Sequence, residues 1–185
     1  RAIGHTRYAT TGGAGLRNVQ PLFAELAEGG IAVAHNGNLT NAMTVQRALQ
    51  KQGSIFTSTS DTETILHLVA TSREKDINSR FIEAVRQLEG AFSLVALTAK
   101  KMIGCRDPLG IRPLVLGDLD GAWILASETC ALDIIGARFV RDLKPGEMVV
   151  ITNKGIESHF PFEPAKPRFC IFEYVYFSRP DSSVE

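Results

Sequence analysis

The second half of the chain alternates short apolar segments with tight polar turns, and this pattern limits the fold more than any other feature. The turns read KK, PLG and DLDG. They are too short for the crossover of about a dozen residues that joins parallel strands, so the segments are predicted to pair as antiparallel hairpins. A short helix is expected over residues 127–135. The predicted strands are residues 92–97, 102–106, 114–116, 123–126, 147–152 and 156–160.

The first half mixes strand and helix patterns. Residues 30–35 form an apolar run that ends at Asn36 and Gly37, which predicts a buried strand followed by a tight turn. A later helix begins with SDTE, the form of a capping box in which Ser60 and Glu63 satisfy each other's end of the turn. The expected class is α+β, with antiparallel sheets and helices on their outer faces. Helices are predicted over residues 41–53, 60–69 and 78–90.

The composition excludes several classes of protein. The chain has 185 residues, with 20 basic and 20 acidic side chains and no net charge. One domain, or one domain and a short tail, fits this length. No surplus of Lys and Arg is available to attract nucleic acid or anionic lipid. No apolar run approaches the roughly 18 residues of a membrane span. Three widely spaced cysteines indicate neither a disulfide framework nor a zinc site, so a reducing, cytoplasmic setting is expected.

Common nucleotide and metal motifs are missing from the sequence. Residues 12–15 read GGAG, which is not a dinucleotide fingerprint, and no phosphate-binding loop, CxxC or HExxH occurs. The glycine cluster is instead expected to be a flexible loop that opens and closes over a ligand.

Polar segments at the ends of predicted elements carry the candidate chemistry. Arg7 offers a bidentate fork for a carboxylate. The side-chain amide of Asn36 and the backbone N–H of Gly37 can converge on one developing oxyanion. Asp61 can receive an ammonium group. Together they suit a zwitterionic amino acid whose carbonyl is attacked. The segments are residues 4–12 (GHTRYATTG), 35–38 (HNGN) and 60–63 (SDTE).

Each of these residues also has a simpler structural interpretation, and only their joint occurrence favours function. Asn-Gly is commonly a turn, an aspartate at a helix start is commonly a cap, and histidines beside apolar strands commonly form hydrogen bonds at strand ends. Arg106 and Asp107 are expected to form a buried salt bridge or turn hydrogen bonds. Cys105 and Cys130 are expected to be small buried apolar side chains.

The three segments resemble the class II glutamine amidotransferases of the N-terminal-nucleophile superfamily. Within that group, the chain is most similar to the amidophosphoribosyltransferase family over nearly its whole length. The resemblance implies a four-layer αββα sandwich of antiparallel sheets, incomplete at the N-terminus. Four motifs distinguish the amidophosphoribosyltransferase family from other class II amidotransferases. They are Tyr8 after the arginine and residues 18–21 (NVQP), 106–114 (RDPLGIRPL) and 173–182 (EYVYFSRPDS).

The resemblance also implies an activity. Members hydrolyse glutamine in one domain and pass ammonia to a phosphoribosyltransferase domain. There the ammonia displaces pyrophosphate from phosphoribosyl pyrophosphate and gives phosphoribosylamine, the first committed step of purine (IMP) synthesis. Arg7, Tyr8 and Asp61 match glutamine-binding residues, and Asn36 and Gly37 match the oxyanion hole. Residues 1–165 match the glutaminase domain, and residues 166–185 match the connector into the transferase domain.

One departure concerns the nucleophile, which in the family is an N-terminal cysteine whose own amino group is the base. Arg1 is not that cysteine, so the chain is expected to be an internal piece that is inactive alone. No cofactor is expected within it, and Mg²⁺ is expected for the transferase domain. Some members bind a 4Fe-4S cluster, and Cys170 matches a ligand position; simple burial of Cys170 is the alternative. A homo-oligomer, either a dimer or a tetramer, is expected for the full enzyme.

Two other functions stay open at this point. The chain could be a non-catalytic module that binds glutamine or a partner. It could also belong to another class II amidotransferase, of the hexosamine or asparagine synthetase type, although the RPDS ending disfavours this.

Overall fold

A computed structural model describes residues 1–6 and 15–183 of the protein. Four α-helices are present in the described part: α1 (Ala42–Lys51), α2 (Thr62–Thr71), α3 (Ile77–Val85) and α4 (Thr129–Ile134). A 3₁₀ turn, η1 (Leu16–Asn18), and a π-helical turn, η2 (Glu173–Phe177), lie near the two ends. The strands are β1 (Leu22–Leu26), β2 (Gly29–Leu39), β3 (Gly90–Thr98), β4 (Met102–Arg106), β5 (Val115–Leu119), β6 (Ala122–Ala126), β7 (Arg138–Asp142), β8 (Met148–Thr152) and β9 (Gly155–His159).

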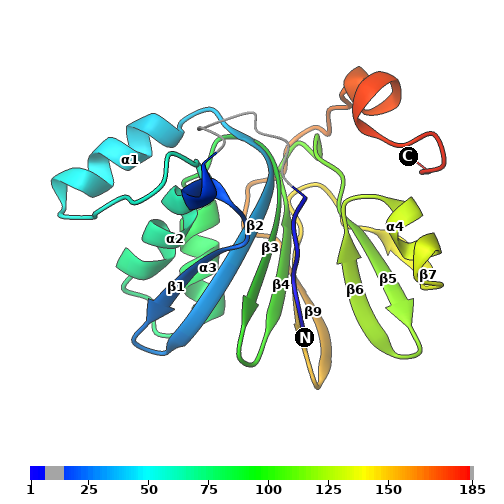
Figure 1. Ribbon diagram of the computed structural model, residues 1–185, viewed down its shortest axis with the longest axis horizontal. Helices are drawn as coiled ribbons and strands as arrows, with labels where there is room; N and C mark the ends of the chain where they lie inside the picture. Colours follow the sequence, from blue (N-terminus) through cyan, green and yellow to red (C-terminus); the bar gives the residue numbers. More distant parts are fainter. Residues whose placement is uncertain (7–14, 184–185) are drawn as a thin grey trace.

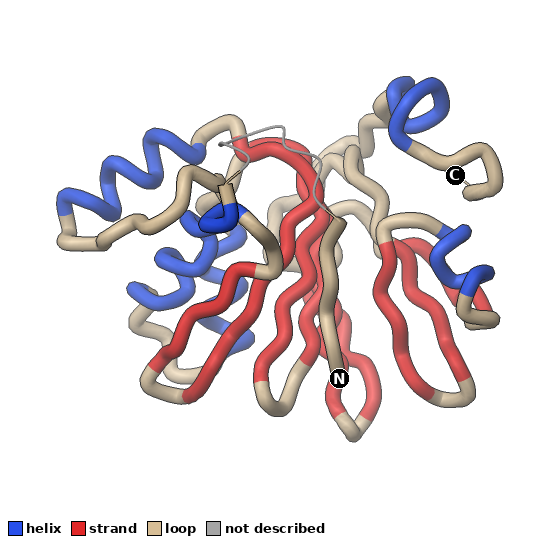
Figure 2. The backbone as a smooth tube through the Cα atoms, viewed as in Figure 1, coloured by secondary structure: helices blue, strands red, loops and turns tan. Residues whose placement is uncertain are grey.

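The strands form two antiparallel sheets that pack face to face (Figures 1 and 2). A six-stranded sheet has the order β1-β2-β3-β4-β8-β9, and a three-stranded sheet has the order β6-β5-β7. The pleat of β8 shows how the layers are filled. Met148 and Val150 point into the core beneath the helices, whereas Val149 and Ile151 point into the core between the sheets.

Helices cover the outer face of each sheet. The helices α1, α2 and α3 lie on the six-stranded sheet, and α4 packs on the three-stranded sheet through Leu132 (Figure 1). The four layers confirm the predicted αββα arrangement. Among the described residues, no helix combines the length and the apolar character needed to cross a bilayer.

The strand β2 contradicts the turn predicted at Asn36 and Gly37. It continues through both residues to Leu39, and it pairs with β3 as Asn36↔Ser93 and Gly37↔Phe92. Pairing with a strand so distant in the sequence overrides the local turn preference of Asn-Gly. The strand nevertheless needs a glycine here, because Gly37 has φ +142° and a Cβ at this position would lie 2.1 Å from the carbonyl oxygen of Ala91.

The capping box predicted at the start of α2 is also wrong. Asp61 occupies the cap position, and its side chain makes no cap hydrogen bond. Glu63 turns back to the preceding loop, where its carboxylate accepts from the backbone N–H groups of Thr57 (2.8 Å) and Ser58 (2.7 Å). The carboxylate of Glu63 therefore fixes the loop before α2 and does not cap the helix.

Candidate functional site

A pocket of about 930 Å³ is lined by residues from the end of β2, the segment before α2, the β4–β5 loop and the C-terminal segment. Three of the predicted site residues, Asn36, Gly37 and Asp61, line it together. Residues 4–6, 35–38 and 60–61 all line the pocket, so the structure brings the described parts of all three predicted polar segments into one cavity. The other lining residues are Gly4, His5, Thr6, Gln20, His35, Asn38, Ser60, Ala91, Ile111, Arg112, Ser127, Glu128, Cys170, Glu173, Tyr176 and Phe177.

Asp61 supplies a negative charge to this pocket. Its Oδ2 accepts from the backbone N–H of Leu39 at 3.1 Å, and its Oδ1 lies 3.6 Å from Nδ1 of His35. Burial would raise the pKa of Asp61, but the hydrogen bond and charge of His35 and the backbone N–H groups of Leu39 and Thr62 outweigh burial and lower it. Asp61 is therefore an anion at neutral pH and can receive an ammonium group.

The NVQP segment ties the polar segments to one another. Asn18 is fully buried, donates from Nδ2 to Oγ1 of Thr59 (2.9 Å) and accepts from the backbone N–H of Thr59 (2.8 Å). Gln20 accepts from the backbone N–H of His35 through Oε1 at 2.6 Å. These contacts fix the segment before Asp61 and the segment before Asn36 relative to each other.

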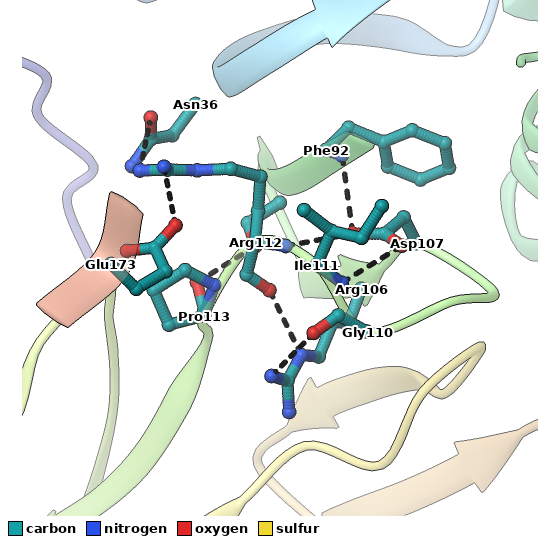
Figure 3. A network of polar contacts seen from close by, with 10 residues as sticks. Asn36, Phe92, Arg106, Asp107, Gly110, Ile111, Arg112, Pro113 and Glu173 are labelled. Atoms are coloured by element: carbon teal, nitrogen blue, oxygen red, sulfur yellow. Dashed lines mark hydrogen bonds and ion pairs between the residues drawn. The ribbon is translucent and has the colours of Figure 1, made fainter. Parts of the chain in front are cut away.

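The loop between β4 and β5 is organised around a buried aspartate, Asp107, and a half-buried arginine, Arg106 (Figure 3). Asp107 has no exposed surface and accepts from the backbone N–H groups of Phe92, Leu109, Ile111 and Arg112 at 2.9–3.3 Å. The Arg106 guanidinium donates to the carbonyl oxygens of Gly110, Arg112 and Leu143. The prediction of turn hydrogen bonds for this pair is confirmed. The pair holds the loop in the shape that directs the side chain of Arg112 at the pocket.

Arg112 and Glu173 are pocket residues that sequence reasoning did not assign to the site. The Arg112 guanidinium donates to Oε1 of Glu173 (2.6 Å) and to Oδ1 of Asn36 (3.1 Å) (Figure 3). Burial and the charge of Glu128 raise the pKa of Glu173, against the opposing charge of Arg112. Both residues lie in motifs noted above, but no local signal indicates that the two motifs meet.

The remaining predictions concern the glutamine-binding residues Arg7 and Tyr8 and the candidate cluster ligand Cys170. Arg7 and Tyr8 lie outside the described residues. Cys170 lines the pocket, but residues 1–6 and 15–183 contain no group of three or more His, Cys, Asp or Glu side chains that could hold a metal ion. These residues alone therefore do not fit a 4Fe-4S cluster, which needs about four thiolates. Cys105 and Cys130 are both buried, as predicted.

Comparison with known proteins identifies the family to which this sequence belongs. The family model for the glutamine amidotransferase domain matches residues 5–133. The chain belongs to that family. The match includes Asn36, Gly37 and Asp61, but the separate role of each residue stays a prediction.

The relatives of this amidotransferase domain include amidophosphoribosyltransferases. The enzyme of Rhizobium etli is 56% identical over 99% of the chain, and that of Bacillus subtilis is 44% identical over 100%. A solved glutamine phosphoribosylpyrophosphate amidotransferase of B. subtilis, complexed with ADP and GMP, superposes with a TM-score of 0.93 at 41% identity over 97% of the chain. The chain spans 38% and 39% of the length of the two curated relatives, and 39% of the solved chain.

Proposed function

We propose that these residues form the glutaminase part of an amidophosphoribosyltransferase. The overall reaction is glutamine, phosphoribosyl pyrophosphate and water to phosphoribosylamine, glutamate and pyrophosphate. The observation that carries the proposal is the meeting in one pocket of the Asp61 carboxylate with Asn36 and Gly37. The similarity to amidophosphoribosyltransferases along the whole chain supports it.

In this proposal, the charge of Asp61 in the pocket supports the binding of glutamine. Asp61 receives the α-ammonium group of glutamine, since its lowered pKa keeps it ionised. Arg7 binds the α-carboxylate; this part rests on the sequence motif. The amide of Asn36 and the N–H of Gly37 then face the side-chain carbonyl oxygen. Attack on the carbonyl carbon moves negative charge onto that oxygen, and the two donors stabilise it.

The nucleophile in this proposal is the N-terminal cysteine of the family. The α-amino group of this cysteine takes the thiol proton, and the thiolate forms a bond to the glutamine carbonyl carbon. The amino group then returns the proton to the leaving nitrogen, so collapse of the tetrahedral intermediate breaks the carbon–nitrogen bond, releases ammonia and leaves a thioester. Water then hydrolyses the thioester to glutamate and restores the thiol. Cys105 is unsuited to this role, because burial and the charge of Asp107 raise the pKa of its thiol far above the usual value.

A panel of ammonia acceptors tests the proposed function. The complete product of the gene is incubated with glutamine and one of phosphoribosyl pyrophosphate, fructose 6-phosphate, or aspartate with ATP, in the presence of Mg²⁺. We expect glutamate and pyrophosphate to form in equal amounts when phosphoribosyl pyrophosphate is the acceptor, and no amination of the other two acceptors. Amination of either other acceptor would identify a different class II amidotransferase. Calorimetric binding of glutamine with no glutamate release would instead indicate a non-catalytic module.

Asp61→Asn is expected to raise the KM for glutamine by roughly 10- to 100-fold, because the ammonium group loses a charged hydrogen-bond partner. The variant keeps the shape of the side chain and an oxygen that can accept from Leu39. Asp118→Asn makes the same change at the β5–β6 hairpin and should leave the KM at the wild-type value. Steady-state kinetics decide the matter. An equal KM for Asp61→Asn and the wild type would show that Asp61 does not bind the ammonium group of glutamine.

A further inference from the structure

The side-chain amide of Asn36 has two orientations that differ by exchange of its oxygen and nitrogen. Only one of them directs the N–H donors at an oxyanion in the pocket. The other directs a carbonyl oxygen there, which would repel the developing negative charge. Stabilisation by Asn36 therefore depends on whatever fixes its amide.

Arg112 is the group that distinguishes the two orientations. Its Nη2 lies 3.1 Å from Oδ1 of Asn36. A guanidinium group has five donors and no acceptor, so it can face only the oxygen of the amide. Arg112 therefore engages the oxygen of the Asn36 amide and not its NH₂ group (Figure 3), and both side chains line the pocket.

Arg112 is itself held on several sides. Glu173 accepts from Nη1 at 2.6 Å, and the carboxylate of Glu173 is almost completely buried. The ring of Phe177 lies 4.9 Å from the guanidinium carbon, within range of a cation–π contact. The backbone N–H of Arg112 donates to Asp107 at 2.9 Å. Because these contacts fix the position of the guanidinium, its N–H donors determine which atom of the Asn36 amide faces it.

We propose that Arg112 is a positioning residue for glutamine hydrolysis, which fixes the Asn36 amide with its N–H donors toward the oxyanion, and that Glu173 holds Arg112 in place for this purpose. The inference deepens the proposed function and rests on it. Arg112 acts through Asn36 and is not required to touch glutamine.

Arg112→Met tests this role, because methionine fills much of the space of the arginine stem and removes the donors. In the complete product of the gene, we expect kcat for glutamine hydrolysis to fall about 10- to 100-fold, the range of a hydrogen bond to a charged group. The KM for glutamine should stay within about twofold, since Asp61 and Arg7 bind the substrate. Arg138→Met is the matched control, because Arg138 is an exposed residue of β7 that pairs with Asp118 of β5. It should keep the wild-type kcat.

A double-mutant cycle separates positioning from a general structural role. If Arg112 works through the Asn36 amide, Arg112→Met should lower kcat in the wild type and have almost no further effect in the Asn36→Ala background. A purely structural contribution would lower kcat by the same factor in both backgrounds. Equal factors would therefore overturn the inference.

Two milder variants keep the test decisive if Arg112→Met does not fold. Arg112→Lys keeps one donor group but loses the fork, so kcat should lie between those of the wild type and the methionine variant. Glu173→Gln keeps an acceptor and removes the charge, and it should also lower kcat with little change in KM. Wild-type kcat in both variants would overturn the inference and leave the proposed function intact. Absence of glutamine hydrolysis by the wild-type protein would overturn the proposed function itself.

Discussion

Replacement of Asn36 by alanine is expected to lower kcat for glutamine hydrolysis by about 100- to 1000-fold, the usual effect of losing one oxyanion donor. The side chain lies in a pocket wall, and its oxygen is already engaged by Arg112. The substitution removes a donor that works only as the carbonyl oxygen becomes charged, so the KM for glutamine should change little. Steady-state hydrolysis of glutamine by the complete protein, with and without an ammonia acceptor, measures the effect.

A matched asparagine and a stability measurement serve as controls for Asn36→Ala. Asn153→Ala, in the β8–β9 hairpin, should keep the wild-type kcat. The thermal unfolding midpoint of Asn36→Ala should remain close to that of the wild type, apart from the loss of its contact with Arg112. A variant that hydrolyses glutamine at the normal rate would show that Gly37 or another group stabilises the oxyanion without Asn36.

The sequence predicted the parts of the fold that depend on neighbouring residues. The segment 102–106 is both the predicted and the observed strand β4, and Gly53, with φ +97°, follows α1 as predicted. Strand β7 was not predicted. It pairs with β5 through residues 20 to 27 positions away, and its sequence RFVRD carries a charge at both ends. Local patterns describe alternation and capping well, but they do not reveal which distant strand supplies a partner.

The same limit applies to the site. Asn36 and Asp61 were predicted from their side-chain groups and Gly37 from its backbone N–H, which together suit a zwitterionic amide, and the structure places the three residues around one pocket. The contacts of Arg112 were not predicted, since they join residues 61 and 76 positions apart. The short polar segments thus indicated the ligand chemistry, whereas the groups that orient those segments emerged only from the three-dimensional arrangement.

Asp107→Ala is expected to destabilise the protein by about 3 kcal/mol or more. The carboxylate is fully buried and accepts four backbone N–H groups, and each buried donor left without a partner costs about 1–3 kcal/mol. Water that enters the space left by the carboxylate would offset part of this loss. Urea unfolding of the 185-residue chain, followed by circular dichroism, gives the change in the free energy of unfolding.

Two further variants establish whether the donors of the loop are the cause of this loss. Asp107→Asn keeps one oxygen acceptor and should lose less stability than Asp107→Ala. Asp118→Ala removes an aspartate that is partly exposed at the β5–β6 hairpin and should cost at most about 1 kcal/mol. If Asp107→Ala unfolded at the same urea concentration as the wild type, the loop would be held by Arg106 and its carbonyl contacts alone. In that case Asp107 could not be the residue that sets the position of Arg112.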